Sequence, residues 1–188
     1  MSPKRELRRQ LFAKLRGLSD GEISSHSERI VDLLLTDSEF RAAKTIASFL
    51  PMRSEPDLTR AWAENDQATW LFSRVTSDSS IEFHHVERPD QLREGEYGFP
   101  EPDPSTCRLA DPSEASVFLV PGVGFDPKTG HRIGRGKGHY DRYLNRARIG
   151  APAIWGICFE TQFTSLEPEP HDIGMHRLLS ETGWRDFP

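Results

Sequence analysis

The stretch Ser116–Leu144, SVFLVPGVGFDPKTGHRIGRGKGHYDRYL, predicts a buried strand, a glycine-rich loop and a helix in succession. Residues 116–120 form a short apolar run of the kind that is typical of a buried strand. Residues 140–146 have the pattern of a helix. In the loop between them, glycine occupies alternate positions from 134 to 138, and glycine allows backbone N–H groups to turn towards a ligand. This loop is therefore predicted to bind an anion.

Positive charge is concentrated in two segments of an otherwise acidic chain. Residues 126–148 contain seven Lys or Arg against two Asp, and residues 1–18 contain six Lys or Arg against one Glu, so each segment carries +5. The whole chain carries −5, which leaves −15 on the remaining residues. Glycine-rich backbone, cations and a following helix N-terminus together make a phosphate site. We expect both segments to meet in one polyanion pocket, the alternative for residues 1–18 being a solvated basic helix face.

Asp141 lies among these cations, where a carboxylate would repel bound phosphates unless it held a divalent cation. We therefore predict that Asp141 is a magnesium ligand. The Walker A pattern fails, because His131 stands five residues before Gly136 and Gly138 follows Lys137. The G-x-G-x-x-G pattern also fails, because the third glycine comes one residue early. By spacing alone, a phosphate-binding loop and a solvated hairpin connection both stay open.

Two strings, residues 121–126 and 130–144, closely resemble the signature of the 5-formyltetrahydrofolate cyclo-ligase family, also called methenyltetrahydrofolate synthetases. The resemblance implies that residues 132–140 contact ATP, that residues 135–139 also reach the folate, and that Asp141 binds magnesium. At His139 this sequence departs from the family, which more often has Tyr there. The ATP ligands implied in this loop are Arg132, Ile133, Gly134, Arg135, Gly136, Lys137, Gly138, His139 and Tyr140, of which Arg135, Gly136, Lys137, Gly138 and His139 are also implied folate ligands.

The basic N-terminal segment contains a second element of the same family. Lys4-Arg5-Glu6-Leu7-Arg8 is similar to a short basic element on the first helix of the cyclo-ligases that contacts ATP, so Lys4, Arg5 and Arg8 are predicted ATP ligands. Near the other end of the chain, Asp172 follows a strand and a proline-rich turn. It matches a second magnesium-linked Asp of the family.

The segment after the first predicted strand carries the implied folate contacts. Leu50 and Glu55 have the spacing at which the family places an apolar residue and a glutamate against the folate. A carboxylate suits that role because it can accept hydrogen bonds from the adjacent N–H and amino groups of a pterin. The alternative for Glu55 is an acidic residue at the N-terminus of the following helix. Residues 100–102, Pro-Glu-Pro, resemble a turn that lies near the substrate in the family, and a plain proline turn is the alternative.

Strands and helices alternate along the rest of the chain. Leu7, Leu11, Leu15 and Leu18 recur at helical spacing, and Ser19 with Glu22 forms a capping box before a second helix. The patterns predict further helices at 56–65 and 140–146, strands at 45–50, 69–75, 81–86, 116–120, 153–159 and 176–181, and a loop at 87–106. This alternation predicts a single α/β domain over residues 1–188, with three layers and a mostly parallel central sheet. The resemblance implies the same fold.

Composition and cysteine usage predict a cytoplasmic protein. The sequence has no uncharged stretch of 18 residues and no apolar segment after its basic start, so we expect neither a membrane span nor a signal peptide. Cys107 and Cys158 are far apart and lack zinc-site spacing, so they should be reduced. His84 and His85 are neighbours on a predicted strand and point to opposite faces, which argues against a metal site there.

The resemblance implies an ATP- and magnesium-dependent ring closure of 5-formyltetrahydrofolate to 5,10-methenyltetrahydrofolate, with release of ADP and phosphate. Arg135 and Lys137 are the expected catalytic residues, because phosphoryl transfer needs mainly positioning and charge neutralisation. We expect small-molecule substrates, a monomer, and no nucleic-acid or membrane partner. Two alternatives are a phosphosugar-binding enzyme, which would need a general base and no ATP, and a nucleic-acid-binding module. Net negative charge and few aromatic residues among the basic ones count against the latter.

Overall fold

The computed structural model describes residues 3–76, 80–95, 98–147, 150–169 and 171–188. Within them, seven strands form one sheet in the order β11-β10-β9-β6-β1-β2-β3. The inner pairs are parallel, whereas β3 and β11 run antiparallel at the two edges. The prediction of a mostly parallel sheet is thereby confirmed. The strands are β1 (Thr45–Ser48), β2 (Thr69–Val75), β3 (Ile81–His85), β6 (Val117–Val120), β9 (Ala153–Ile157), β10 (Arg177–Ser180) and β11 (Gly183–Asp186).

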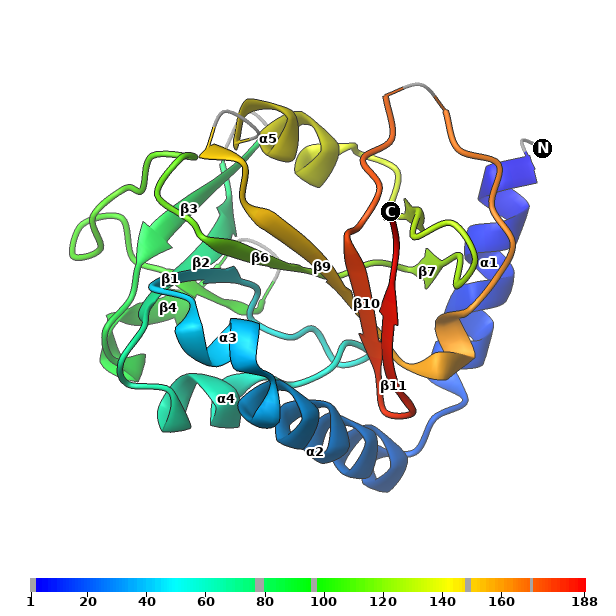
Figure 1. Cartoon of the computed structure of the whole chain (residues 1–188), viewed down its shortest axis with the longest axis horizontal. Helices are drawn as coiled ribbons and strands as arrows, with labels where there is room; N and C mark the ends of the chain where they lie inside the picture. The colour runs from blue at the N-terminus through cyan, green and yellow to red at the C-terminus, as the bar shows by residue number, and fades with distance from the viewer. Residues whose placement is uncertain (1–2, 77–79, 96–97, 148–149, 170) are drawn as a thin grey trace.

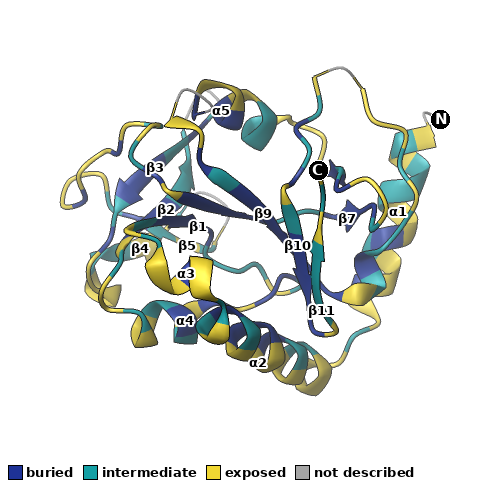
Figure 2. Ribbon diagram, in the orientation of Figure 1, coloured by how far each residue is buried: buried dark blue, intermediate teal, exposed yellow. Residues whose placement is uncertain are grey.

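Helices cover both faces of this sheet and make it the middle of three layers (Figure 1). On one face α2, α3 and α4 pack against side chains such as Ile46, Phe72 and Trp155. On the other face α5 packs through Tyr143 and Leu144 against the opposite side of the strands. Figure 2 shows that the central strands are buried, while the outer surface of α2 is exposed. The helices are α1 (Pro3–Arg16), α2 (Asp20–Thr36), α3 (Ser38–Ala42), α4 (Thr59–Glu64) and α5 (His139–Ala147).

The predicted start of the second helix is confirmed by its capping contacts. The Ser19 side chain accepts a hydrogen bond from the Glu22 N–H at 3.3 Å, and the Glu22 carboxylate accepts one from the Ser19 N–H at 2.8 Å. These two contacts satisfy N–H groups that have no partner within the helix.

None of the helices in the described ranges combines the length and the apolar character that crossing a membrane requires.

The prediction that residues 87–106 form a loop was wrong in part. The segment contains a short 3₁₀ turn, η1 (Pro89–Gln91), and two antiparallel strands, β4 (Leu92–Glu94) and β5 (Pro100–Pro102). The Pro-Glu-Pro sequence is thus a strand and not a turn. Proline is tolerated there because β5 pairs on one side only, with β4, and needs no N–H donor on its other side.

Other short elements lie outside the predicted pattern. The central loop folds back as a hairpin of two-residue strands, β7 (Gly124–Phe125) and β8 (Arg132–Ile133). A 3₁₀ turn, η3 (Glu160–Gln162), follows β9, and β11 extends the sheet beyond the predicted last strand. The strands predicted at 45–50 and 153–159 end two residues earlier, and the helix predicted at 56–65 is shorter at both ends.

The sheet topology determines where a ligand can bind. From β1 the chain continues to β2 on one side, whereas from β6 it continues to β9 on the other side. Since β1 and β6 are neighbours, their carboxyl ends flank the point at which the winding direction reverses, where open α/β sheets bind their ligands. The segments that follow these two strands are residues 49–57 and 121–138.

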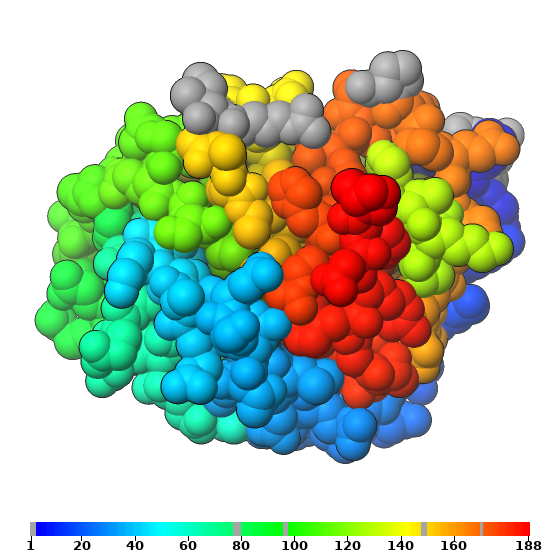
Figure 3. Space-filling view, in the orientation of Figure 1, coloured from blue at the N-terminus to red at the C-terminus, as the bar shows by residue number. Residues whose placement is uncertain are grey.

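Helix α1 lies beside the main body, next to the β7–β8 hairpin (Figure 1). Leu11 of α1 forms a small core with Val123 and Ile133. Figure 3 shows α1 in blue against the orange chain of the segment before β10, on the side where the yellow-green hairpin is exposed. The N-terminal basic segment is therefore held against the glycine-rich region, although more than 100 residues separate them in sequence.

Candidate active site

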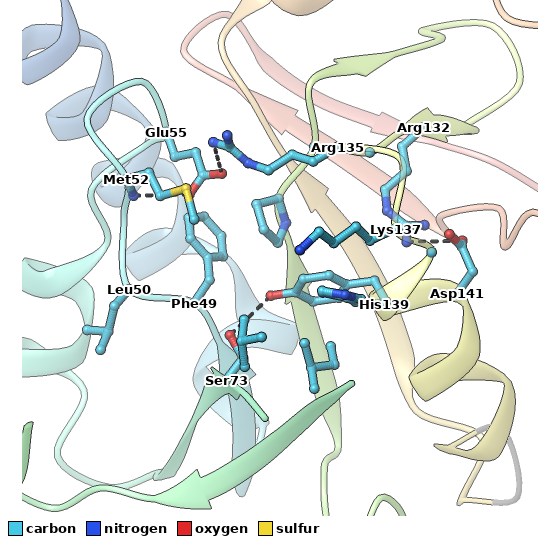
Figure 4. Close-up of a pocket in the computed structure, with 17 residues that line it drawn as sticks. Phe49, Leu50, Met52, Glu55, Ser73, Arg132, Arg135, Lys137, His139 and Asp141 are labelled. Carbon is cyan, nitrogen blue, oxygen red and sulfur yellow. Dashed lines mark hydrogen bonds and ion pairs between the residues drawn. The ribbon is translucent and has the colours of Figure 1, made fainter. Parts of the chain in front are cut away.

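A cavity of about 160 Å³ lies at the carboxyl ends of β1 and β6. Figure 4 shows the loop after β1 on one side and the glycine-rich loop on the other, with charged side chains directed between them. One wall is apolar and consists of Phe49, Leu50, Met52, Val75, Ile81 and Pro121. The opposite wall is polar and charged, and includes Arg132, Gly134, Arg135, Lys137, Gly138, His139, Tyr140 and Asp141. Glu55, on the loop after β1, and Ser73, on β2, also line the cavity.

The two basic segments of the sequence meet at this cavity. The Arg8 Nε donates a hydrogen bond to the Gly134 carbonyl oxygen at 2.8 Å. A Cβ atom placed on Gly136 would lie 3.4 Å from the Arg8 guanidinium carbon, so this side chain lies directly against the loop. Arg5 is exposed on α1, whereas Lys4 reaches Asp172 at 3.4 Å and Glu169 at 3.1 Å.

The backbone of the glycine-rich loop depends on glycine at two positions. Gly136 has φ of +98° and Gly138 has φ of +63°, values that residues with a Cβ rarely adopt. Arg142 donates a hydrogen bond to the Lys137 carbonyl oxygen at 2.7 Å, which ties the loop to the first turn of α5. Helix α5 begins at His139, so its N-terminus adjoins the loop and favours an anion there. Ile133 is 4% exposed and packs against α1, so its side chain belongs to the core.

Glu55 is a buried carboxylate between the two loops. Its residue is 9% exposed, and its Oε2 accepts a hydrogen bond from the Met52 N–H at 3.1 Å. Its Oε1 faces the Arg135 guanidinium, with 3.3 Å between Oε1 and Nη2. Glu55 therefore lines the cavity, whereas the alternative had made it an acidic residue at the N-terminus of the following helix. Helix α4 begins only at Thr59.

Two residues of the charged wall, Arg132 and Asp141, form an ion pair with each other. The Arg132 Nη2 lies 3.0 Å from the Asp141 Oδ1, and the Arg132 side chain is only 4% exposed. The same Asp141 oxygen accepts a hydrogen bond from the Ile173 N–H at 3.4 Å. The Arg132 guanidinium also lies 5.8 Å from the centre of the Tyr140 ring. Asp141 is thus fixed in place by one buried cation and by the segment that carries Asp172.

The first turn of α5 contributes two further side chains to the cavity. Burial, followed by the charges of Arg142 and Lys137, lowers the pKa of His139 below its usual value, so the imidazole is neutral at pH 7. Its Nε2 is buried, and it has no hydrogen-bond partner among the described residues. Burial raises the pKa of Tyr140, whose hydroxyl lies 3.4 Å from the Ser73 Oγ.

Asp172, the second predicted magnesium ligand, is not among the described residues that line the cavity, but its carboxylate is of the kind that binds a hard cation. Although burial alone raises the pKa of Asp172, the Glu169 N–H bond and the nearby Lys4 ammonium hold it below its usual value. Asp172 therefore stays ionised, as a metal ligand must. Donor atoms of Glu169, His171 and Asp172 lie within 4.8 Å of one another. Asp141 contacts the same segment of the chain through the Ile173 N–H. The carboxylate oxygens of these residues are of the type that magnesium takes, whereas the His171 nitrogen is not.

Sequence reasoning predicted only Leu50 of the apolar wall, and it missed the pairing of the buried Arg132 with Asp141. Val75 is the last residue of β2, which pairs with β1, and Ile81 is the first residue of β3, which pairs with β2. The rule that ligands bind at the carboxyl ends of strands, applied to β2, would have pointed to Val75. For the Arg132–Asp141 pair no local signal existed, because Arg132 was expected to contact ATP and Asp141 to bind magnesium, and not each other.

Comparisons with known proteins agree on one family. The model of the 5-formyltetrahydrofolate cyclo-ligase family matches residues 1–181. The chain is 28% identical to the 5-formyltetrahydrofolate cyclo-ligase of Mycoplasma pneumoniae, over 95% of this chain and 98% of that protein. A match to the enzyme of Mycolicibacterium smegmatis is 37% identical but spans about half of each chain, 50% and 47%. The solved structure of Aquifex aeolicus 5,10-methenyltetrahydrofolate synthetase superposes with a TM-score of 0.86 at 30% identity, covering 98% of this chain and 93% of that one.

Proposed function

The chain belongs to the 5-formyltetrahydrofolate cyclo-ligase family, and from this premise we propose that it converts 5-formyltetrahydrofolate to 5,10-methenyltetrahydrofolate with ATP as co-substrate. ADP and phosphate are the other products. The observation that carries the proposal is the meeting of Arg135, on the glycine-rich loop, with Glu55, on the loop after β1. A site for phosphates and a site for a pterin edge thereby share one cavity.

The chemistry requires the formyl oxygen to become a good leaving group. That oxygen attacks the γ-phosphorus of ATP, the bond from this phosphorus to the β–γ bridging oxygen breaks, and ADP departs. The folate N10 then bonds to the activated formyl carbon and loses its proton, and phosphate leaves with the former formyl oxygen. This sequence needs no nucleophilic Ser, Cys or His from the protein, because phosphoryl transfer depends mainly on positioning and charge neutralisation.

The charged wall supplies the neutralisation. Arg135 and Lys137 line the cavity, and the glycines between and beside them leave backbone N–H groups accessible to phosphate oxygens. Arg8 holds the start of this loop through the Gly134 carbonyl oxygen. Lys4 and Arg5 lie on the same helix as Arg8, α1, and are proposed to contact the part of the nucleotide that lies towards this helix.

The apolar wall and Glu55 suit the folate. Phe49, Leu50 and Met52 offer surface against which a flat pterin ring can pack. Glu55 accepts hydrogen bonds from the N–H and amino groups at one edge of that ring. His139, neutral and with a buried Nε2, offers one more polar contact inside the cavity.

Asp141 and Asp172 are proposed to hold the magnesium that accompanies ATP. When bound, this ion would neutralise phosphate charge. Arg132 fixes the Asp141 carboxylate from behind, and Lys4 contacts Asp172, so each acid is held in place before any ion binds. We also propose that the enzyme works as a cytoplasmic monomer without nucleic-acid or membrane partners. In support of the absence of a nucleic-acid partner, the two basic segments meet at this site through the contact of Arg8 with Gly134.

One assay tests the proposed reaction. Purified protein is mixed with 5-formyltetrahydrofolate and Mg-ATP, the absorbance of methenyltetrahydrofolate is followed, and ADP is quantified at the end. We expect one ADP for each methenyltetrahydrofolate, and no product when ATP is omitted. Product formation without ATP, or ADP release that does not depend on the folate, would contradict the proposal.

A further inference from the structure

Arg135 and Glu55 form an ion pair that spans the cavity between two loops. The residues are 80 positions apart in sequence, and 3.3 Å separates the Arg135 Nη2 from the Glu55 Oε1. Figure 4 shows the Arg135 side chain extended across the cavity to Glu55, while Lys137 lies beneath it. The Arg135 guanidinium also lies 5.4 Å from the centre of the Phe12 ring of α1. The cation assigned to the phosphates is therefore engaged by the carboxylate assigned to the folate.

The two side chains of this ion pair differ in how far they are exposed to water. The Glu55 side chain is 10% exposed, and its second oxygen is already occupied by the Met52 N–H. Loss of the guanidinium would leave a buried carboxylate without a cation, which is strongly unfavourable. The Arg135 side chain is 45% exposed, so water can replace the carboxylate when the guanidinium moves. When the ion pair breaks, the buried Glu55 carboxylate therefore loses more favourable free energy than the exposed Arg135 guanidinium does.

Resting on the proposed function, we propose that this ion pair couples the two substrates, so that nucleotide and folate each bind more tightly when the other is present. A triphosphate at the glycine-rich loop attracts Arg135 away from Glu55. The Glu55 carboxylate, now without its cation, needs new hydrogen-bond donors, and the N–H and amino groups of the pterin supply them. Coupling of this kind is reciprocal, since each ligand must change the affinity of the other by the same factor.

Two roles for Arg135 predict different effects of removing its side chain. It can couple the two substrates through Glu55, or it can only contact a bound ligand. If Arg135 only attracts the anionic folate, Arg135→Ala weakens folate binding whether or not nucleotide is present. If Arg135 instead occupies Glu55 in the resting protein, the same substitution removes a competitor. Folate then binds to Arg135→Ala alone at least as tightly as to the wild type, and nucleotide no longer strengthens that binding.

Isothermal titration calorimetry of the full chain tests this directly. The Kd of 5-formyltetrahydrofolate is measured alone and with saturating magnesium and the non-hydrolysable β,γ-imido analogue of ATP. For the wild type we expect the analogue to lower this Kd about tenfold, within the usual range of coupling between sites. For Arg135→Ala we expect no change on adding the analogue, and for Arg135→Lys, which keeps the charge, an intermediate change.

Arg146→Ala is the matched control, because Arg146 is an exposed arginine on α5 that packs over Tyr143 and does not line the cavity. It should keep the full coupling. Independent binding of the two ligands to the wild type would overturn the inference, as would coupling that persists in Arg135→Ala. Weaker folate binding by Arg135→Ala in the absence of nucleotide would overturn it too. Failure of the wild type to bind 5-formyltetrahydrofolate at all would instead overturn the proposed function, and the inference with it.

Discussion

At the scale of single residues, Glu55 is the side chain whose role can be tested most selectively. Glu55→Gln keeps the shape of the side chain but removes the charge that strengthens its bonds to the pterin edge. Folate binding should weaken by about 1.5 to 3 kcal/mol, the usual value of a hydrogen bond to a charged group. Nucleotide binding should not weaken, because no phosphate contact is proposed for Glu55 and the loss of its charge leaves Arg135 freer to meet the phosphates.

Asp57→Asn is a suitable control for this variant. Asp57 is exposed two residues further along, and its carboxylate accepts hydrogen bonds from the Thr59 N–H and hydroxyl, which an Asn can also satisfy. Titration of each variant with 5-formyltetrahydrofolate and with the nucleotide gives the comparison. Equal losses of affinity for both ligands in Glu55→Gln would rule out the folate assignment.

Asp141→Asn separates a metal ligand from a purely structural acid. If Asp141 helps to hold magnesium, turnover falls by orders of magnitude and higher magnesium concentrations partly restore it. The ion pair adds a second effect, because the buried Arg132 guanidinium then faces a neutral side chain. We expect the free energy of unfolding to drop by about 3 kcal/mol as well, as is usual when one partner of a buried pair is lost.

Rates measured against magnesium concentration, together with a denaturant titration of both proteins, distinguish these effects. A large loss of stability combined with an unshifted magnesium profile would mean that Asp141 serves the fold and that the metal is held elsewhere. Asp172 would then be the next ligand to substitute.

The sequence predicted the charged side of the cavity well at this scale. Glu55, Arg135, Lys137 and Asp141 all line it, because a motif of fixed spacing places them on loops that end at one edge of the sheet. The engagement of Arg135 by Glu55 was not predictable, since both were expected to meet ligands and not each other. Contacts across 80 residues depend on how the loops pack, which single-residue patterns do not contain.

At the scale of elements, the contact between α1 and the β7–β8 hairpin holds the basic N-terminal segment at the site. A Cβ atom on Gly124 would lie 2.6 Å from the Leu11 Cδ1 and 3.2 Å from the Gln162 carbonyl oxygen. Gly124→Ala should therefore push α1 away and cost about 1 to 3 kcal/mol of stability, as overpacking usually does. The affinity for ATP should fall with it, because Arg8 loses its position.

Gly21→Ala provides the control, because a Cβ at Gly21 has nothing within 4 Å and the residue lies in α2. Alanine favours helix, so this variant should be neutral or slightly more stable. Melting curves and ATP titrations of both variants test the prediction. A Gly124→Ala protein with normal ATP affinity would show that docking of α1 is not needed for nucleotide binding.

A second contact between elements links β3 to the segment before β6 and gives a pH-dependent stability. The hydrogen bond from Arg108, with further bonds from the Asp111 N–H and His85, lowers the pKa of Glu114 to about 2. Since the pKa is lower in the folded state, the stabilisation is complete above the unfolded value near 4.3 and disappears as the pH falls towards 2. Glu114→Gln should cost about 1 to 2 kcal/mol at pH 7, reduced from the full shift because Arg108 is largely exposed.

Denaturant titrations of the two proteins from pH 7 to pH 2 measure this contribution. The difference in unfolding free energy between wild type and Glu114→Gln should stay constant down to about pH 5 and then shrink. A difference that does not change with pH would indicate that the carboxylate stabilises the protein by packing and not by its charge.

Elements with long apolar runs were predictable, and the shortest ones were not. The strands that became β1, β2, β6 and β9 lie in the middle of the sheet, and each contains a buried apolar run, such as residues 70–72 in β2 and 117–120 in β6. The pairs β4–β5 and β7–β8 have two or three residues per strand, which is too short for any periodicity to be visible. Their proline and glycine content made them resemble loops.

At the scale of the whole molecule, the fold brings two separate basic segments together at the switch point of the sheet. The order β9-β6-β1-β2 places the carboxyl ends of β1 and β6 side by side, and α1 returns to the loop after β6. The charge distribution predicted this meeting. The chain is acidic overall, yet each of two distant segments carries +5, and two such segments form one polyanion pocket when they lie together. The position of α1 beside the three-layer body, however, was visible only in the structure.

The central claim is that ATP-dependent cyclisation depends on this meeting of α1 with the glycine-rich loop. Arg8 and Arg9 are neighbours on α1, but Arg8 contacts the Gly134 carbonyl oxygen whereas Arg9 is exposed and pairs with Glu6. The direct measurement is the rate of methenyltetrahydrofolate formation against ATP concentration for wild type, Arg8→Gln and Arg9→Gln. We predict that the wild type turns over, that Arg8→Gln raises KM for ATP about tenfold through loss of about 1.4 kcal/mol of binding, and that Arg9→Gln behaves as wild type. No turnover by the wild type, or equal effects of the two substitutions, would contradict this account.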